Sequence, residues 1–471
     1  MRTGTVVSTH KWLQHPSELV ARYNSWDCKL TADLRPHMEE QLRKSGNWDY
    51  WTTRFWPLVP IVTAMQSRGL GHLDREARNQ MRARLRSEIS KLEKGILDGV
   101  VGDYTDKVFN SPKQLGRLLY GEWGLPTPPV TRSRRANSTD LQALAWVLEH
   151  LRRRDEPHRL RLHDLFHRSR LQTVLERYLV IEGDPDGRVR PTIKLYGTET
   201  MRFAYAGGPG EAIQQWPPEC RHLIRAAPGK VFVARDYSQL EARILAVLSN
   251  DRPSLEAFAA GRDVHTQNTL DLFGLTLESF LGFDGARQKA LRNYAKTFLY
   301  GISYGGKADS IKMKVFCPCY RCAEKAPPQV NLAREEVRQV TQRWEQVHFA
   351  VMDWRAKLVD SVFGYGQNRV WVSPFGYHRR FWEPRDEGER SLMNFPMQHC
   401  GAQIINAAMV RLRDVPLVLQ MHDELVAEVP EADADSTLER MRIEMEAPVV
   451  ELGRTIFPTE GKVGATWADL K

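Results

Sequence analysis

The stretch Arg235-Asp236-Tyr237-Ser238-Gln239-Leu240-Glu241-Ala242-Arg243 decides how this chain is organised. It follows an apolar, β-branched run at 230–234, which predicts a buried strand. It leads into apolar residues spaced like one face of a helix: Leu240, Ile244, Leu245 and Leu248. Asp236 is therefore expected at a strand-to-helix junction. An aspartate there is commonly a helix cap, so its meaning depends on partners elsewhere in the chain.

The bulk properties are compatible with a large protein that binds a polyanion. The 471 residues are enough for several lobes, and 67 Lys and Arg against 58 Asp and Glu give a net charge of +9. No segment has the length of a membrane span, and the N-terminus lacks the apolar core of a signal peptide. Six cysteines in so long a chain do not form a disulfide framework, so we expect a cytoplasmic protein.

Three helices are predicted from periodicity and caps. Asp74 is placed to cap a helix with apolar residues at 81, 85, 89, 92 and 96, and Ser138 or Thr139 is expected to start another. Residues 335–360 predict one long amphipathic helix whose tryptophans belong to the core. Many arginines accompany the first helices. They are either a solvated surface or phosphate contacts.

A second group of acids lies in the segment 416–430, which reads as two apolar strands around a tight turn. The turn holds His422, Asp423 and Glu424. Titratable groups between apolar strands are costly unless they bind a metal or are hydrogen-bonded. The alternative is a surface hairpin with a polar tip.

The third element is a basic helix. Arg292, Lys296 and Tyr300 stand four residues apart and therefore share one face, and glycines at 301, 305 and 306 are expected to end the helix. Cations at this spacing repel one another unless a bound anion, such as a triphosphate, neutralises their charge. A solvated basic face is the alternative. Two aspartates on separate strands can hold two divalent ions for in-line phosphoryl displacement, so the three elements together predict nucleotidyl transfer to a nucleic-acid primer.

These three segments closely resemble motifs A, B and C of the family A DNA polymerases. Asp236–Arg243 resembles motif A, Arg292–Tyr304 motif B and His422–Glu424 motif C, in the order of the family and within a match from about residue 57 to Trp467. The resemblance implies an α+β right-hand fold with thumb, palm and fingers, and synthesis of DNA on a primer-template from dNTPs. It suggests a phage-like member, which would act in the host cytoplasm.

The resemblance also implies a division of the chain. Residues 1–56 would resemble the end of an exonuclease domain, and 57–190 a helical thumb. Residues 191–255 would form the first part of the palm, an antiparallel sheet with helices. Residues 256–370 would form helical fingers with a cysteine-containing insertion, and 371–471 the second part of the palm.

Roles carry over from the family motifs at the catalytic centre. Asp236 and Asp423 would bind two Mg²⁺ ions together with the carbonyl of Tyr237, and Glu424 would be an accessory carboxylate. Lys296 would donate a proton to the leaving pyrophosphate.

The substrate contacts carry over in the same way. Glu241 would exclude a ribose 2′-hydroxyl, while Arg292, Lys296 and His265 would contact the triphosphate. Tyr300 would lie at the sugar and Tyr304 near the templating base. Residues expected to reach the primer-template are Arg202, Gln214, Arg390, Asn394, Gln398 and His422. The usual small residues after the minor-groove arginine are replaced by Phe203-Ala-Tyr205.

Two further features are less specific. Tyr23-Asn-Ser-Trp-Asp27 resembles the last motif of a 3′–5′ exonuclease, but no other exonuclease carboxylate precedes it. We therefore expect no proofreading from this chain alone and a separately encoded exonuclease or processivity subunit as a partner; the alternative is a helix with a chance match. Cys317, Cys319 and Cys322 suggest zinc, although a structural site needs a fourth ligand, for which His348 and Cys400 are candidates. Reduced cysteines in a surface loop are the alternative.

Other functions remain open on the motifs alone. A single-subunit RNA polymerase or a reverse transcriptase shares the two-aspartate palm, but Glu241 argues against RNA synthesis. A non-catalytic subunit that only binds primer-template is disfavoured, because every expected catalytic carboxylate and cation is present.

Overall fold

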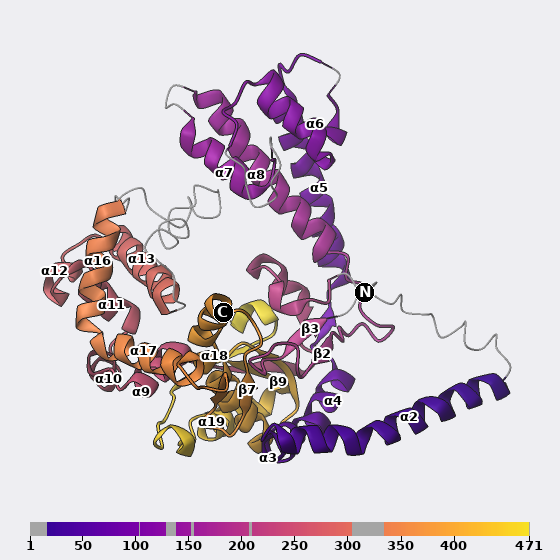
Figure 1. Cartoon of the computed structure of the whole chain (residues 1–471). Helices are drawn as coiled ribbons and strands as arrows, with labels where there is room; N and C mark the ends of the chain where they lie inside the picture. The colour runs from indigo at the N-terminus through magenta and orange to yellow at the C-terminus, as the bar shows by residue number, and fades with distance from the viewer. Residues whose placement is uncertain are drawn as a thin grey trace.

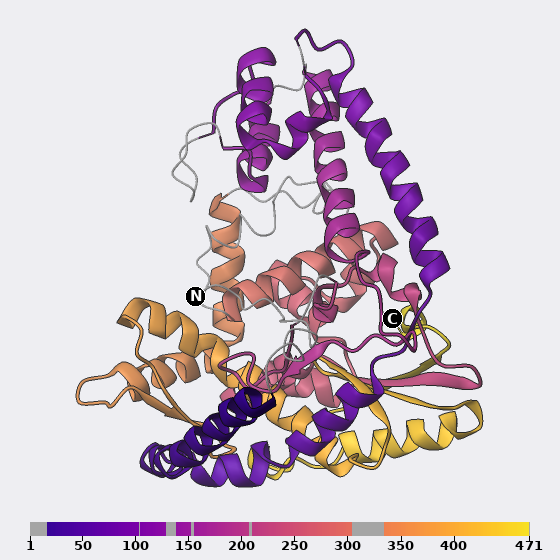
Figure 2. The ribbon, with the colours of Figure 1, turned by 90° about the vertical axis from the view of Figure 1, so that its right-hand side faces the viewer.

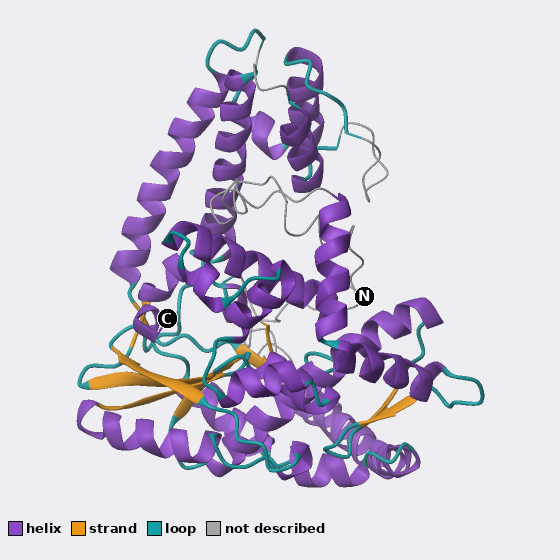
Figure 3. Cartoon of the chain, turned by 90° about the vertical axis from the view of Figure 1, so that its left-hand side faces the viewer, coloured by secondary structure: helices purple, strands orange, loops and turns teal. Residues whose placement is uncertain are grey.

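The computed structural model describes residues 17–102, 104–128, 138–151, 155–206, 210–303 and 334–470. At its centre lies a four-stranded antiparallel sheet of order β10-β5-β9-β8 (Figure 3). Its strands are β5 (Lys230–Tyr237), β8 (Leu417–Met421), β9 (Glu424–Pro430) and β10 (Thr459–Gly464). The strand predicted before the opening motif and the hairpin around His422 are both confirmed.

Helices cover this sheet and enclose its core. α19 (Ala434–Met445) packs on β5 and β10, and α4 (Leu58–Arg68) packs on β8. α9 (Leu240–Ser249) follows β5, and its predicted apolar face is buried against α18 (Arg385–Arg411). The junction of β5 and α9 is thus held from both sides, which fixes the backbone around Asp236.

A first helical projection rises from this body (Figures 1 and 2). It is built on the long helices α5 (Arg75–Leu97) and α8 (Glu156–Arg177), with α6 (Pro112–Gly116) and α7 (Leu141–His150) at its far end. The predicted cap is confirmed, because the Asp74 carboxylate accepts from the Ala77 backbone N–H. The outer part has its own apolar core, separate from the core under the sheet.

A second helical projection lies across from the first (Figure 1). Its helices are α10 (Arg252–Ala259), α11 (Val264–Phe273), α12 (Leu277–Leu281), α13 (Gly285–Ser303) and α16 (Arg334–Val347). α17 (Phe349–Phe363) then returns to the body. The second projection shares one continuous core with the sheet through residues such as Phe298 and Trp344, as the base of the first projection does through Leu85 and Leu171.

Three of the expected helix boundaries are wrong. The single helix expected over 335–360 is two helices, because the backbone of His348 leaves helical geometry (φ −101°, ψ 41°) and its side chain bonds to other elements. Gly301 does not end α13, which continues to Ser303, while Gly305 and Gly306 lie outside the described residues. The cap of α7 is Asp140, which accepts from Ala143 N–H, while Ser138 donates to Asp140. A carboxylate is the stronger acceptor at that end of a helix.

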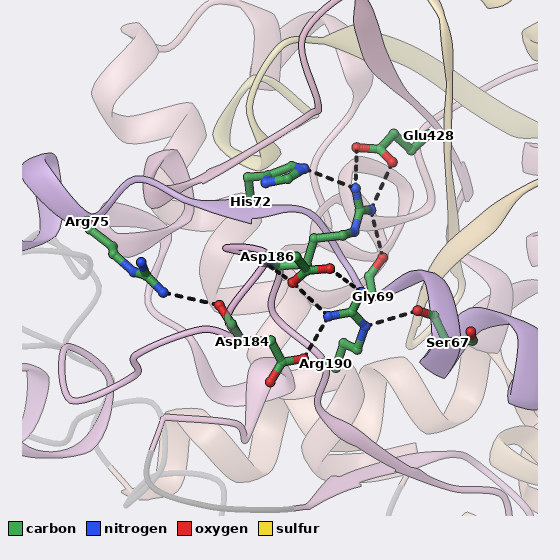
Figure 4. A network of polar contacts seen from close by, with 9 residues as sticks. Ser67, Gly69, His72, Arg75, Asp184, Asp186, Arg190 and Glu428 are labelled. Carbon is green, nitrogen blue, oxygen red and sulfur yellow. Dashed lines mark hydrogen bonds and ion pairs between the residues drawn. The ribbon is translucent and has the colours of Figure 1, made fainter.

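Two partly buried arginines tie the base of the first projection to the body of the molecule (Figure 4). Arg188 donates to Glu428 of β9 at 2.8 Å and to the Gly69 carbonyl at 3.1 Å. Arg190 bonds to Asp184 at 2.7 Å and to Asp186 at 2.6 Å. Breaking a buried pair by removing one partner is costly, so these contacts fix where the projection begins relative to the strand that carries Glu424.

Three two-stranded sheets and one protruding helix complete the structure. The strand pairs are β1 (His72–Leu73) with β4 (Ile224–Arg225), β2 (Thr192–Lys194) with β3 (Ala204–Ala206), and β6 (Val370–Val372) with β7 (His378–Arg380). α2 (Ser17–Lys44) extends away from the body without a single buried residue, and α3 (Trp48–Tyr50) follows it (Figure 1). None of the described helices has the length and apolarity needed to cross a membrane.

Candidate active site

The two predicted aspartates lie on adjacent parts of the central sheet. Asp236 is on β5 directly opposite Glu424 of β9, and the Tyr237 backbone N–H donates to the Asp423 carbonyl oxygen at 3.1 Å. Strand pairing therefore brings together two carboxyl groups that are 187 residues apart in the chain. The Tyr237 side chain is buried on the other side, with its hydroxyl donating to the Met445 carbonyl. Only its backbone is available as the expected metal ligand.

The electrostatics of Asp423 fit a cation site. Burial, followed by the charge of Asp236, raises the pKa of Asp423 to about 7; Glu241 adds to this effect and Arg202 opposes it. Acidic oxygens that face one another in a buried place repel unless a cation lies between them. Hard carboxylate and carbonyl oxygens are the ligands that Mg²⁺ prefers. The donor set thus fits the divalent ions that the motifs imply.

A cavity of about 270 Å³ opens beside these acids. Asp423 and His422 line one side, Glu241 lies on α9, and His265 faces it from α11. The Glu241 carboxylate forms an ion pair with Arg202, the residue expected in the minor groove. The predicted sugar-selecting and DNA-contacting residues are therefore in direct contact.

Strained backbone surrounds this cavity. Met201, Gln239 and His422 have φ of 65°, 57° and 57°, in the left-handed region that residues with side chains seldom adopt. Each is next to, or two residues from, a predicted functional residue. Such conformations persist only where the surrounding structure imposes them, and they cluster at functional sites.

Gln239 has a role that the sequence did not indicate. Its side-chain oxygen accepts from the Val264 N–H at 3.0 Å, which joins the motif after β5 to the start of α11. His265 is the next residue along that helix. The contact links residues 25 apart and has no local signature.

The basic face of α13 is present, and it has an acidic partner. One side of the helix is buried through residues such as Tyr294 and Phe298, while Lys296 is exposed. Arg292 bonds to Asp263 through two contacts, Nε to Oδ2 at 2.7 Å and Nη2 to Oδ1 at 3.0 Å. Sequence reasoning missed Asp263, although its position just before α11 is a typical cap signal.

This arrangement lowers the pKa of both Asp263 and His265, which leaves the aspartate charged and the histidine neutral. The pKa of Asp263 is lowered to about 2, since hydrogen bonds from Arg292 and Thr266 outweigh the effect of burial. Burial, reinforced by the charges of Arg292 and Lys296 and opposed by that of Asp263, lowers the pKa of His265 to about 4. His265 is therefore neutral at pH 7 while no anion is bound.

The predictions for the side chains of Tyr300 and Tyr304 concern atoms outside the described part of the chain. The backbone of Tyr300 belongs to α13, but its side chain lies outside the described residues, as does all of Tyr304. Their expected contacts with sugar and template stay predictions.

A second cavity, of about 470 Å³, gathers most of the residues expected to touch DNA. Its lining includes Arg202, Gln214, Asn394, Gln398 and His422. Arg390 does not line it; the side chain is exposed on α18 and bonds to the Asp386 carbonyl. Five of the six residues from three distant segments thus converge.

The unusual Tyr205 has a structural partner near this cavity. Its buried hydroxyl donates to the Gln420 carbonyl at 2.7 Å and accepts from the Gln420 N–H at 3.1 Å. The tyrosine thereby holds β3 to the strand that precedes His422. Tyr205, which departs from the family pattern, therefore has a structural role through these hydrogen bonds.

The zinc prediction cannot be followed at its three central residues, because Cys317, Cys319 and Cys322 lie outside the described part of the chain. Within the described ranges no three or more His, Cys, Asp or Glu side chains are grouped as a metal site would need, so no described zinc site replaces the predicted one. Of the two candidate fourth ligands, Cys400 is fully buried in α18 and His348 faces two aspartates. Cys28 is exposed and Cys220 buried.

A pair of carboxylates on an antiparallel sheet, faced by a basic helix, is the arrangement expected of a polymerase-type site. The sequence of residues 75–469 matches DNA polymerase family A, so the chain belongs to that family.

Similar proteins agree with this assignment. The chain is 27% identical over 462 residues to DNA polymerase I of Geobacillus stearothermophilus, covering 93% of this chain and 48% of that protein. It is 28% identical over 438 residues to the thermostable DNA polymerase I of Thermus aquaticus, covering 88% and 48%. The chain thus spans about half the length of these relatives.

A solved structure resembles the whole arrangement. It is the POL domain of Pol1 from M. smegmatis in complex with DNA primer-template and dNTP. The TM-score is 0.75 at 22% identity, with 93% of this chain and 74% of that chain covered. The expected α+β right-hand fold is confirmed.

Proposed function

We propose that this protein synthesises DNA on a template, adding deoxynucleotides to a primer 3′-hydroxyl. One observation carries the proposal: strand pairing brings Asp236 next to the turn that holds Asp423, and Asp423 lines a cavity together with Glu241 and His265, which are expected to contact the nucleotide. Membership of DNA polymerase family A supports it. The M. smegmatis relative holds primer-template and dNTP, and we propose the same ligands for this chain.

Asp236, Asp423 and the Tyr237 carbonyl would hold Mg²⁺. When bound there, such ions would supply Lewis-acid stabilisation of the attacking and leaving oxygens in an in-line displacement. The protein supplies a fixed set of oxygens, because both aspartates belong to paired strands and turns. Glu424, which is buried opposite Asp236, would be an accessory carboxylate near the primer terminus.

The triphosphate would bind along α13. Lys296 is exposed and free to approach the phosphates, and we assign it the proton that the leaving pyrophosphate accepts. Arg292, held by Asp263, offers its remaining N–H groups to a phosphate. The bound phosphates raise the pKa of His265 and so favour its charged form.

Selection of the sugar is assigned to Glu241. Its carboxylate lies in the cavity and is held by Arg202, which fixes where its bulk stands. A 2′-hydroxyl would meet this side chain. Arg202 and the other residues of the 470 Å³ cavity would contact the primer-template.

The chain would divide into the thumb, fingers and palm that the motifs imply. The first helical projection would be the thumb (57–190) and the second the main part of the fingers (256–370). The sheet with its helices would be the palm (191–255 and 371–471).

Primer extension tests the proposal. With Mg²⁺, a DNA primer-template and the four dNTPs, we expect products whose sequence complements the template. No extension by the intact protein would favour the binding-subunit alternative. Equal extension with rNTPs would indicate an RNA polymerase, and a preference for an RNA template would indicate a reverse transcriptase.

We further propose that α2 binds a separately encoded 3′–5′ exonuclease. Six large apolar side chains with exposed fractions of 51% to 58% recur at helical spacing along it: Leu19, Tyr23, Trp26, Leu30, Leu34 and Met38. An apolar stripe of this length is typical of an interaction surface. Tyr23, which belongs to the segment resembling an exonuclease motif, lies within it.

Affinity capture from the source cells tests this partner. The wild-type protein should retain an activity that removes a mismatched 3′ nucleotide, and Leu30→Asp should lose it. Ala32→Asp, on the opposite face of α2, is the matched control and should retain it. Absence of any such activity with the wild type would exclude the proposed partner.

A further inference from the structure

His348 occupies the break between α16 and α17, and its imidazole is buried with 1% of its surface exposed. Nδ1 lies 2.8 Å from Oδ2 of Asp251, and Nε2 lies 3.3 Å from Oδ2 of Asp271. The first contact is a hydrogen bond. The second is not aligned as one, so its attraction is mainly Coulombic.

The two carboxylates belong to different elements. Asp251 is fully buried and caps α10, and Asp271 lies in the last turn of α11. The imidazole therefore joins three helical elements at one point: the start of α10, the end of α11 and the α16–α17 break. A buried histidine between two acids is unusual, because burial alone favours the neutral ring.

This junction is connected to the nucleotide-facing end of α11. The ring of His348 stacks on Trp344 at 4.4 Å between centroids, and the Trp344 indole N–H donates to Asn268 at 2.6 Å. Asn268 in turn donates to the Val264 carbonyl at 2.8 Å, next to His265. Val264, His265, Asn268 and Trp344 all line the 270 Å³ cavity.

We propose that His348, as an imidazolium bridging Asp251 and Asp271, is a positioning residue for nucleotide binding, which fixes α11 so that His265 and the Asp263–Arg292 pair face the triphosphate. The proposal rests on the proposed function, since a nucleotide must bind at this cavity. Loss of the bridge would weaken binding of the dNTP more than it slows the chemical step, because His348 touches neither substrate nor reacting atoms.

The charged state of His348 follows from its neighbours. Burial lowers the pKa of His348, but the hydrogen bond to Asp251 and the charges of Asp251 and Asp271 outweigh it, so the pKa is raised above its ordinary value. Asp251 and Asp271 are the acids that face the ring. The nearest described cation on α16, Arg343, points to the Leu272 carbonyl at the end of α11. The bridge is therefore complete at low pH and weakens as the pH rises through the pKa of His348.

Steady-state kinetics of the full chain with primer-template, Mg²⁺ and one dNTP between pH 6.5 and 9 test this. We expect His348→Gln to raise KM for the dNTP by about fivefold or more at pH 6.5, with kcat changed less than twofold. As the pH rises toward 9 the ratio of the two KM values should fall, because a growing fraction of the wild type has lost its bridge as well. Asp271→Asn should shift this convergence to lower pH, because it removes one of the two charges that favour the imidazolium.

His37→Gln, on the exposed surface of α2, is the matched control and should match the wild type at every pH. A KM ratio for His348→Gln that is independent of pH, or a change confined to kcat, would overturn the proposal. Failure of the wild type to extend a primer would instead remove the proposed function itself. Histidine NMR titrations of the wild type should contain one curve that is missing in His348→Gln, and its pKa should lie above 6.5. A lower pKa would also overturn the proposal.

Discussion

The central sheet and the second helical projection both bury charged groups, but they balance them differently. In the projection, Arg292 meets Asp263, and His348 meets Asp251 and Asp271. At the sheet, Asp423 faces the like charges of Asp236 and Glu241, and the pKa of Asp423 is raised to about 7. These charges of the projection have partners within the chain, whereas the raised pKa of Asp423 fits a site that takes up cations from outside.

This difference separates groups that hold the fold from groups that await a ligand. A buried charge with an internal partner is destabilising to remove. A buried acid among other acids is destabilising to keep, and it persists where function requires it. Substitutions in the two regions should therefore have opposite consequences for activity and stability.

The largest effect is expected for Asp423→Asn. The amide keeps the size of the side chain but cannot supply a charged metal ligand, so the rate of primer extension should fall on the order of 10³-fold. The thermal unfolding midpoint should stay equal to that of the wild type or rise, because a repulsion is relieved. A large loss of stability would contradict the contrast between the regions.

Glu241→Ala should change which sugar is accepted. Discrimination against rNTPs should decrease by roughly 10²-fold, measured as the ratio of kcat/KM for a dNTP and its rNTP. Glu241→Gln keeps the bulk and loses the charge that binds Arg202. If Glu241→Gln discriminates against rNTPs as poorly as Glu241→Ala does, the charge of Glu241, and not the volume of its side chain, selects the sugar.

Asp251→Asn should have the reverse profile of Asp423→Asn. It removes a buried partner of His348, and the folded protein should lose about 2 kcal/mol of stability. The thermal unfolding midpoint should fall, while kcat at saturating substrate changes little. Asp353→Asn, which removes an exposed helix pair with Lys357, is the control and should have a negligible effect.

The smallest effect concerns pH. Because the pKa of His348 is raised on folding, the stabilisation by its bridge is fully present below about pH 6.5 and is lost as the pH rises through the folded pKa. The stability difference between wild type and His348→Gln, from chemical denaturation, should shrink from pH 6 to pH 9. A difference that grows over this range would show that the ring is buried in its neutral form.

Local pattern was sufficient for the strand before Asp236, the hairpin around His422 and the cap at Asp74. Each depends on a few neighbouring residues, which the sequence displays directly. The helix break at His348 was missed because the apolar spacing continues through it. Its cause is a pair of aspartates 97 and 77 residues earlier in the chain.

The sequence by itself determined the family, the right-hand fold and the identity of the candidate catalytic residues, because these reside in short motifs with fixed internal spacing. Only the tertiary structure decided which charges are balanced. It brought Asp263 to Arg292, Glu241 to Arg202, and Asp251 and Asp271 to His348, while leaving Asp423 among acids. Electrostatic energy depends on distance in space and on burial, and neither can be read from the order of residues along the chain.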